Sequence, residues 1–437
     1  MKNYKRAKIM FLAFLATCLM FFTNDCQLID VQKTAIIVAL GIDYAENQLE
    51  ITAQIAIPQA TDTQTSNSDA ILTAKGKTLF EAIDNIGVTT GWYPKLAFCN
   101  LIVFGKELLK KEYLPIIDYM LTSNRFVNSA ILAAADGAAK DILSSPTPLD
   151  YVSSFALEKI LVRDIDRANT VLVTDIREFS ANVRSESGFS YLPLIKKIQA
   201  QDKEKGDSSD GSGGGENGGN SAENTSDFNK KSGYKSIIAT SQVSGGGAPG
   251  KGGSAESGSE KSSDDSSIFD ARASLLFERG KISCTITPEQ TLCYNALKEK
   301  VTESFFDVSY KKNDKTINSI VTVVGNKKEI TLKIENGIPC YTAKLKLYCK
   351  TEEVDANNTT GKLAFYDIAS KACLNALAEK TQKTLYELLE LSKANGCDVF
   401  EIKNLLYRNL PYNYPSFKDN ALNISKIKFE VECVNKT

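Results

Sequence analysis

The chain has 437 residues, 43% hydrophobic and 24% charged, so it is long enough for roughly two to four globular domains. Its formal net charge of −1 at pH 7 gives no bulk attraction to nucleic acid, and no nucleic-acid partner is expected. It contains no histidine, which excludes Ser-His and Cys-His nucleophile pairs and removes the commonest metal ligand. Carboxylate or Ser-Lys catalysis stays open. We nevertheless predict no enzyme, with no catalytic, cofactor-binding or metal site.

The first 25 residues predict a signal peptide or membrane anchor. Four Lys or Arg side chains at positions 2–8 precede fourteen mainly apolar residues, 9–22. A spanning helix needs about 20 apolar residues, so this shorter run is typical of a signal peptide. The basic flank stays on the cytoplasmic side, so we expect the mature chain to face outward.

Two cysteines beside the apolar run are candidates for lipid attachment. Cys26 follows it after three polar residues, as in bacterial lipoproteins, although residues 22–25 are not the small residues that lipoprotein cleavage favours. Residues 15–18 are closer to that pattern, but cleavage before Cys18 leaves a very short apolar run. Lipidation of Cys26 is favoured, with an uncleaved anchor and lipidation of Cys18 as alternatives. All three place the protein at the membrane.

The cysteines give no metal or redox motif. There are ten in the chain, and no two have CxxC spacing. We interpret those beyond the leader as small buried hydrophobic residues, while disulfides stay open because sequence does not fix their connectivity.

Strand and helix patterns alternate between residues 36 and 143. Residues 36–43 and 49–57 predict a hairpin with a four-residue loop, Tyr44–Asn47, and residues 59–69 predict a polar loop. Thr78 is predicted to cap a helix over 79–86, with Glu81 at the capping-box position. The remaining predictions are strands at 101–104 and 129–134 and helices at 114–121 and 138–143.

Residues 201–267 predict a Gly/Ser-rich flexible insertion. They contain 15 of the 27 glycines, with abundant Ser, Asp, Glu and Asn. Such a segment buries too little apolar surface to offset its ordering entropy.

Regular structure resumes after the insertion. We predict a strand at 268–277, a turn at 278–281, and a helix capped by Thr287 with Gln290 in its capping box. A long helix over 361–394 has one apolar stripe and ends at Asn395-Gly396. Asp398, with Glu401 three residues on, is predicted to cap the next helix. The other predicted strands are 320–324, 330–334, 344–347 and 427–434.

These elements predict an α+β fold with three domains of mixed, mainly antiparallel sheets and packed helices. The predicted division is an anchor at 1–25, an N-terminal domain at 26–200, the insertion at 201–267, a middle domain at 268–300 that includes part of residues 1–200 by packing, and a C-terminal domain at 301–437 that contains the long helix.

Two motifs are candidate sites with a structural alternative. Trp92-Tyr93-Pro94 holds the only tryptophan and is interpreted either as a binding anchor or as a partly buried loop. Asp43 is either a site carboxylate or a turn-forming residue, and the turn is favoured.

Several motifs follow one another along the chain: Cys26 with residues 35–43, 76–83, 94–96 with 101–105, 137–143, 191–195, 273–277, 280–281, 287–289 and 397–400. Their order and spacing resemble the Ger(x)C-type lipoproteins, the C subunits of spore germinant receptors. The resemblance covers nearly the whole chain outside residues 201–267.

The resemblance implies a non-catalytic subunit on the outer face of the inner spore membrane, attached through lipid on Cys26. It implies assembly with two integral membrane subunits, of A and B type, and a role in nutrient-triggered germination. It implies no cofactor, and contact with a nutrient germinant stays open. The alternative function is a membrane-tethered solute-binding lipoprotein that serves a transporter.

Overall fold

The computed structural model describes residues 10–15, 17, 33–56, 69–147, 152–162, 170–199, 267–312, 315–354, 364–366 and 368–436. They belong to one compact unit made of residues 1–200 and 265–437. Cys18, Cys26 and residues 201–266 of the predicted insertion lie outside the described residues.

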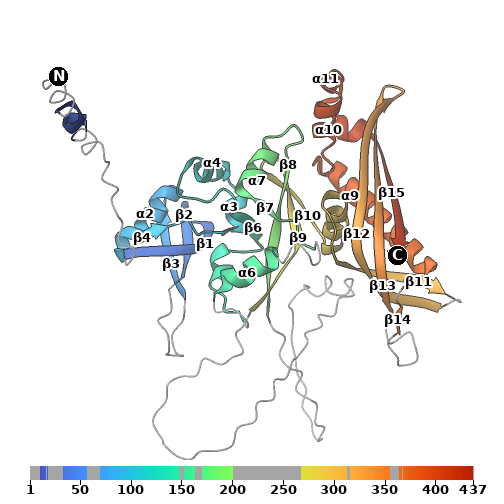
Figure 1. The fold of residues 1–437 in the computed structure, drawn as a ribbon, viewed down its shortest axis with the longest axis horizontal. Coiled ribbons are helices and arrows are strands. Elements are labelled where there is room, and N and C mark those ends of the chain that lie inside the picture. Colours follow the sequence, from blue (N-terminus) through green and yellow to red (C-terminus); the bar gives the residue numbers. More distant parts are fainter. Residues whose placement is uncertain are drawn as a thin grey trace, which may run out of the picture. The chain divides into compact units, whose positions relative to one another are not determined.

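The first sheet has ten strands in the order β10-β9-β8-β6-β5-β1-β2-β3, with β4 paired to β1 and β7 to β6 (Figure 1). The strands are β1 Thr34–Ala45, β2 Gln48–Ala56, β3 Asp69–Gly76, β4 Tyr93–Lys95, β5 Leu101–Phe104, β6 Ile131–Ala135, β7 Thr174–Asp175, β8 Phe189–Gln199, β9 Ser267–Glu278 and β10 Lys281–Ile286.

The centre of this sheet is parallel. Strands β1, β5, β6 and β8 run in one direction, and antiparallel hairpins extend the sheet on both sides. The predicted mixed sheet is therefore confirmed, but its parallel centre was not anticipated. All four side chains of β5 are buried because a central parallel strand is covered on both faces.

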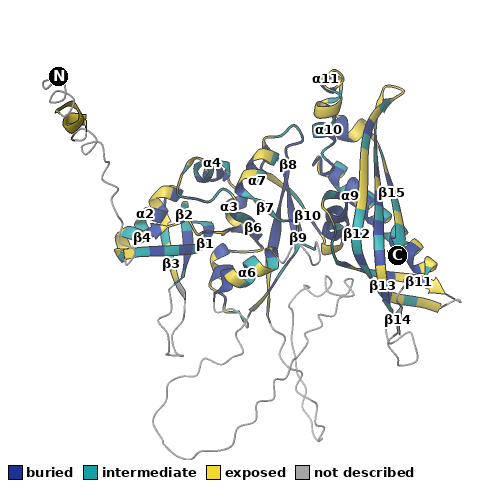
Figure 2. Ribbon diagram, in the orientation of Figure 1, coloured by how far each residue is buried: buried dark blue, intermediate teal, exposed yellow. Residues whose placement is uncertain are grey.

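Helices cover both faces of the first sheet, and side chains alternate between them. Ile102 and Phe104 join the core under α2, α3, α4 and α7, whereas Leu101 and Val103 join the core under α5 and α6. Figure 2 shows the buried positions concentrated in these strands. The helices are α2 Leu79–Thr90, α3 Lys106–Leu109, α4 Leu114–Thr122, α5 Ala139–Leu143, α6 Ser153–Leu161 and α7 Ile176–Val183.

The second sheet has the order β11-β12-β13-β14, with β15 parallel to β13. Its strands are β11 Ser304–Lys312, β12 Lys315–Glu335, β13 Ile338–Val354, β14 Ala364–Tyr366 and β15 Lys426–Asn435. The accompanying helices are α8 Pro288–Lys298, α9 Lys371–Ala394, α10 Ile402–Asn409, α11 Tyr414–Phe417 and α12 Ala421–Ile424. The fold is thus α+β with two mixed sheets.

A third core joins the two sheets. It combines side chains of β8, β9 and β10 with α8, α9 and the second sheet. Residues 268–300, the predicted middle domain, supply β9, β10 and α8 to this arrangement. The division into three domains stays a prediction.

Three hairpins use two-residue turns in which both residues have positive φ. The turns are Glu46-Asn47, Arg279-Gly280 and Asn336-Gly337, with φ values of 53° and 61°, 49° and 78°, and 51° and 75°. This geometry matches the twist of the adjoining strands. The four-residue loop predicted at Tyr44–Asn47 is therefore wrong, because Tyr44 and Ala45 still pair with β2.

The predicted helix caps at Thr78 and Thr287 are confirmed. The Thr78 hydroxyl accepts a hydrogen bond from the Glu81 amide, and Thr287 forms a complete capping box with Gln290. The apolar stripe of the long helix is also confirmed. Its predicted members are all buried: Cys373, Leu377, Thr381, Leu385, Leu388 and Leu389.

Other predicted boundaries were wrong. The long helix begins at Lys371 rather than at 361, because Ser370 caps it and residues 364–366 form β14. The strands predicted at 320–324 and 330–334 are parts of one strand, β12. The prediction omitted β3, which begins at Asp69, and residues 59–68 of the predicted polar loop lie outside the described residues.

The predicted capping box at Asp398 is half right. Its carboxylate accepts hydrogen bonds from the amides of Ile402 and Lys403 at 2.9 and 2.8 Å. The helix begins only at Ile402, however, and Glu401 occupies the N-cap with φ 53°. Glu401 instead accepts a hydrogen bond from the Asn404 side chain.

Candidate functional site

Residues of several sequence motifs meet at one edge of the first sheet. Because β1, β5 and β6 are parallel, their carboxyl ends lie side by side, the usual place for sites in such sheets. Asp43 lies near the end of β1, Gly105 follows β5, and Gly137 follows β6. We call the pocket at this edge the carboxyl-end pocket.

Asp43 fastens β1 to the start of α5. Its two carboxylate oxygens accept hydrogen bonds from the amides of Ala139 and Lys140 at 2.8 and 2.9 Å. Burial raises the pKa of the Asp43 carboxyl above its ordinary value, and the two amide hydrogen bonds oppose that shift. The predicted local turn is therefore wrong for Asp43, because it binds a helix that begins nearly a hundred residues later.

Two glycines are required by this close approach. A Cβ at Gly105 would lie 1.9 Å from Asp43 Oδ1, so only glycine fits beside the carboxylate. A Cβ on Gly41 would lie 3.1 Å from the Ala139 Cβ and from Leu143 Cδ1, which leaves α5 little room on β1. By contrast, a Cβ at Gly137 meets nothing within 4 Å.

The charged groups at this edge are largely paired with one another. Lys140 Nζ lies 3.2 Å from a carboxylate oxygen of Glu50, and Lys106 Nζ lies 3.2 Å from one of Asp136. The pocket has a volume of about 300 Å³. It is lined by Asp43, Tyr44, Ala45, Glu50, Lys106, Glu107, Gly137, Ala138 and Lys140. These contacts order the edge of the sheet and leave a space of small-molecule size.

Sequence reasoning found only part of this site. Asp43 was singled out, and the motif at 137–143 was quoted for its resemblance alone. Glu50, Lys106 and Lys140 were missed. They lie on different elements, and only the parallel order of β1, β5 and β6 brings them together.

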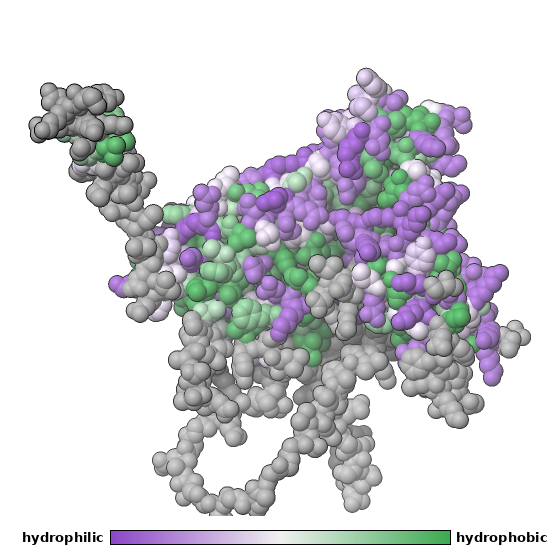
Figure 3. Space-filling model, in the orientation of Figure 1, coloured by the Kyte–Doolittle hydropathy of each residue, from purple (hydrophilic) through white to green (hydrophobic). Residues whose placement is uncertain are grey.

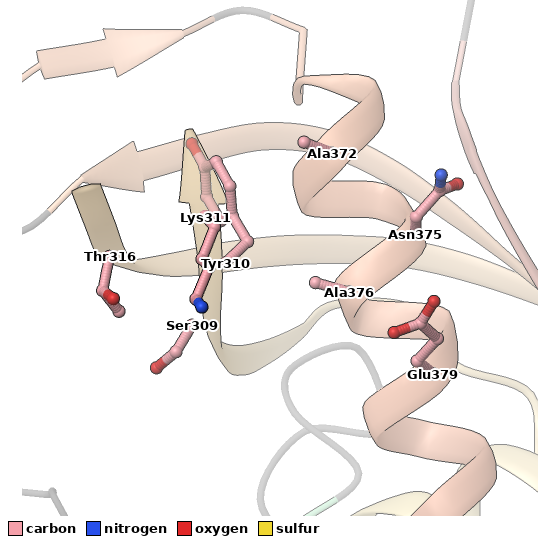
Figure 4. Close-up of a pocket in the computed structure, with 8 residues that line it drawn as sticks. All are labelled: Ser309, Tyr310, Lys311, Thr316, Ala372, Asn375, Ala376 and Glu379. Atoms are coloured by element: carbon pink, nitrogen blue, oxygen red, sulfur yellow. The ribbon is translucent and has the colours of Figure 1, made fainter. Parts of the chain in front are cut away.

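A second pocket of about 380 Å³ lies between β11 and the first turns of α9. In Figure 4 the methyl groups of Ala372 and Ala376 face the strand, whereas Asn375 projects from another side of the helix. Beneath it the fully buried Glu352 accepts hydrogen bonds from the Tyr310 hydroxyl at 2.6 Å and the Ser370 amide at 3.0 Å. Two charged residues of the lining, Lys311 and Glu379, are exposed. The buried network holds the start of α9 on the sheet.

The cysteines within the described ranges are all free thiols. Five are buried, as predicted, and Cys284, Cys340 and Cys433 are partly exposed. Burial raises the pKa of the Cys99 and Cys293 thiols to about 12, so both stay protonated near neutral pH. Among the described residues, no cluster of three or more acidic or cysteine side chains could hold a metal ion.

The motif at Trp92 is more exposed than its interpretation as a partly buried loop predicts. Trp92 is 48% exposed, and Tyr93, which begins β4, is 44% exposed. On the face shown in Figure 3, hydrophilic surface is interspersed with apolar patches, so surface hydropathy alone does not select one site. Within the residues that the structure describes, no helix has both the length and the apolar character needed to cross a bilayer.

Comparisons with known proteins identify the family. A family model described as "Spore germination protein N-terminal domain" matches residues 28–197, and one described as "Spore germination B3/GerAC like, C-terminal" matches residues 273–435. A solved structure titled "Crystal Structure of the GerBC protein" is similar, with 13% sequence identity, a TM-score of 0.47, and coverage of 91% of this chain and 97% of that chain.

No curated protein sequence matches this chain significantly. The two family matches together leave out little beyond the first residues and the region of the insertion. The chain therefore belongs to the GerAC-like family of spore germination proteins.

Proposed function

We propose that this protein is a membrane-anchored, non-catalytic subunit of a spore germinant receptor complex. It sits on the outer face of the inner spore membrane with two integral membrane subunits, of A and B type, and is needed for nutrient-triggered germination. The observation that carries the proposal is the match of both halves of the chain to spore germination domains.

The leader supports attachment to the membrane. A basic stretch, a short apolar run and a cysteine follow one another within the first 26 residues. A lipid on Cys26 would hold the chain at the bilayer surface. Labelling with a fatty-acid analogue should be lost in Cys26→Ala and kept in Cys18→Ala. The reverse pattern would assign the lipid to Cys18.

The state of the carboxyl-end pocket supports a binding or assembly role. Asp43 is committed to the α5 amides, and Lys106 and Lys140 are committed to acidic partners. Each Asp43 oxygen accepts one amide hydrogen bond, and together the two bonds hold the carboxylate against the start of α5, which is a structural role.

Isolation of the tagged chain from spore membranes tests the complex. The A- and B-type subunits should co-purify with the wild-type chain after mild detergent extraction. A chain that is recovered intact but alone, with both subunits present in the same membranes, would contradict the proposal. Association with transporter subunits instead would support the solute-binding alternative.

A further inference from the structure

Three exposed aromatic side chains lie in the segment 92–98, which follows α2. Trp92 and Phe98 are 48% and 54% exposed, and Tyr93 is 44% exposed. Pro94 is buried between Tyr93 and Lys95, so these two side chains share the outer side of β4. The Lys95 ammonium lies 6.0 Å from the centroid of the Phe98 ring. We call Trp92, Tyr93, Lys95 and Phe98 the β4 patch.

The charged residues of the β4 segment itself are positive. Residues 85–100 contain no Asp or Glu, and Lys95 is exposed. Lys33, also exposed, precedes the end of β1 that pairs with β4. Trp and Tyr are enriched where proteins contact lipid headgroups. Lysine side chains beside them add attraction to anionic lipids.

The position of the patch in the chain brings it to the membrane. Thr34 pairs directly with Tyr93, and α2 and β4 lie side by side in Figure 1. Cys26 precedes Thr34 by eight residues, which span at most about 28 Å even when fully extended. A lipid on Cys26 therefore keeps this end of the first sheet close to the bilayer surface.

We propose that the β4 patch docks on the headgroup layer of an anionic bilayer and thereby sets how the first sheet faces the membrane. This inference rests on the proposed anchor at Cys26. The rings of Trp92 and Phe98 enter the boundary between headgroups and acyl chains, and Lys95 and Lys33 meet lipid phosphates. Tyr93 keeps its hydroxyl at the wet side of that boundary.

Trp92 is the only tryptophan, so its fluorescence reports on the patch alone. The full lipidated chain is reconstituted into vesicles of phosphatidylcholine and phosphatidylglycerol, with and without lipids brominated near the top of the acyl chains. We expect the emission to shift to the blue and to be quenched by the brominated lipids. Lys95→Glu combined with Phe98→Asp should weaken that quenching several-fold, because it places two acidic groups in the patch.

Phe305 supplies matched controls, because it lies on β11 of the second sheet and is 47% exposed, about as much as Trp92. Phe305→Glu should leave the quenching unchanged. With the tryptophan moved by Trp92→Phe and Phe305→Trp, the quenching should disappear.

Flotation of the same vesicles separates the docking from the anchor. A chain that floats with the vesicles while Trp92 stays unquenched contradicts the docking and leaves the proposed anchor standing. A chain that does not float contradicts both. Equal quenching of the acidic double variant and the wild-type chain would also overturn the docking, since the rings would then be buried for another reason.

Discussion

Replacing Gly105 with alanine should disrupt the carboxyl-end pocket. The new methyl group would lie 1.9 Å from Asp43 Oδ1, so the carboxylate must leave its position. The Asp43 carboxylate would then lose the hydrogen bonds that it accepts from the Ala139 and Lys140 amides. A hydrogen bond to a charged group contributes about 1.5–3 kcal/mol, and partial exposure reduces this, so we expect a loss of about 3 kcal/mol in the free energy of unfolding.

Urea-induced unfolding followed by circular dichroism measures this loss, and two variants make the test specific. Gly137→Ala should change stability by less than about 0.5 kcal/mol, because nothing lies within 4 Å of the new methyl group. In an Asp43→Ala background the clash is gone, so Gly105→Ala should cost less than about 1 kcal/mol. Equal costs of Gly105→Ala in both backgrounds would refute the reasoning, because the methyl group would then act through other neighbours.

Three further predictions concern other parts of the fold. Burial raises the pKa of Asp398 to about 6, above the ordinary value near 3.9. The protonated carboxyl therefore stabilises the folded state fully below pH 4, and about 3 kcal/mol of that stability is lost as the pH rises through 6. Asp398→Asn should remove this slope from unfolding curves measured between pH 4 and 7, and an unchanged slope would contradict the assignment. Thr287→Ala should cost about 1 kcal/mol in urea unfolding by removing the cap of α8, whereas Thr287→Ser should cost little. Gly337→Ala should lower the free energy of unfolding by about 1–2 kcal/mol, because alanine is strained at the φ of 75° and no other atom lies close to the new methyl group. An unchanged stability would contradict this prediction.

Local chemistry explains what could be predicted from the sequence. Thr78 and Thr287 are followed by Glu81 and Gln290 at the third helical position, and both caps form where that spacing places them. The apolar stripe of the long helix could be predicted because its residues recur with the helical period of 3.6 residues. The family resemblance, which covers both halves of the chain, is confirmed by the two domain matches.

Some errors came from local signals that were overlooked. Asn336-Gly337 is the strongest hairpin signal in the chain, and it joins β12 to β13 as a two-residue turn. Ser370, an ordinary N-cap residue, marks where the long helix begins. Residues 101–104 are apolar without alternation, which indicates a strand buried on both faces and hence a parallel sheet centre.

The carboxyl-end pocket could not be predicted in the same way. Asp43, Gly105 and Ala139 come together only because β1, β5 and β6 are parallel neighbours, and pairing between distant strands leaves no local pattern. A turn was a sound interpretation of an aspartate near the end of a strand, but the amides that bind the Asp43 carboxylate belong to the start of α5.

The most direct test of the central claim is germination itself. The gene for this chain is deleted in its sporulating host, and purified spores are scored for germination against several nutrients. The account predicts that germination fails or slows for at least one nutrient and that the wild-type chain restores it. Normal germination with every nutrient would contradict a role in a germinant receptor.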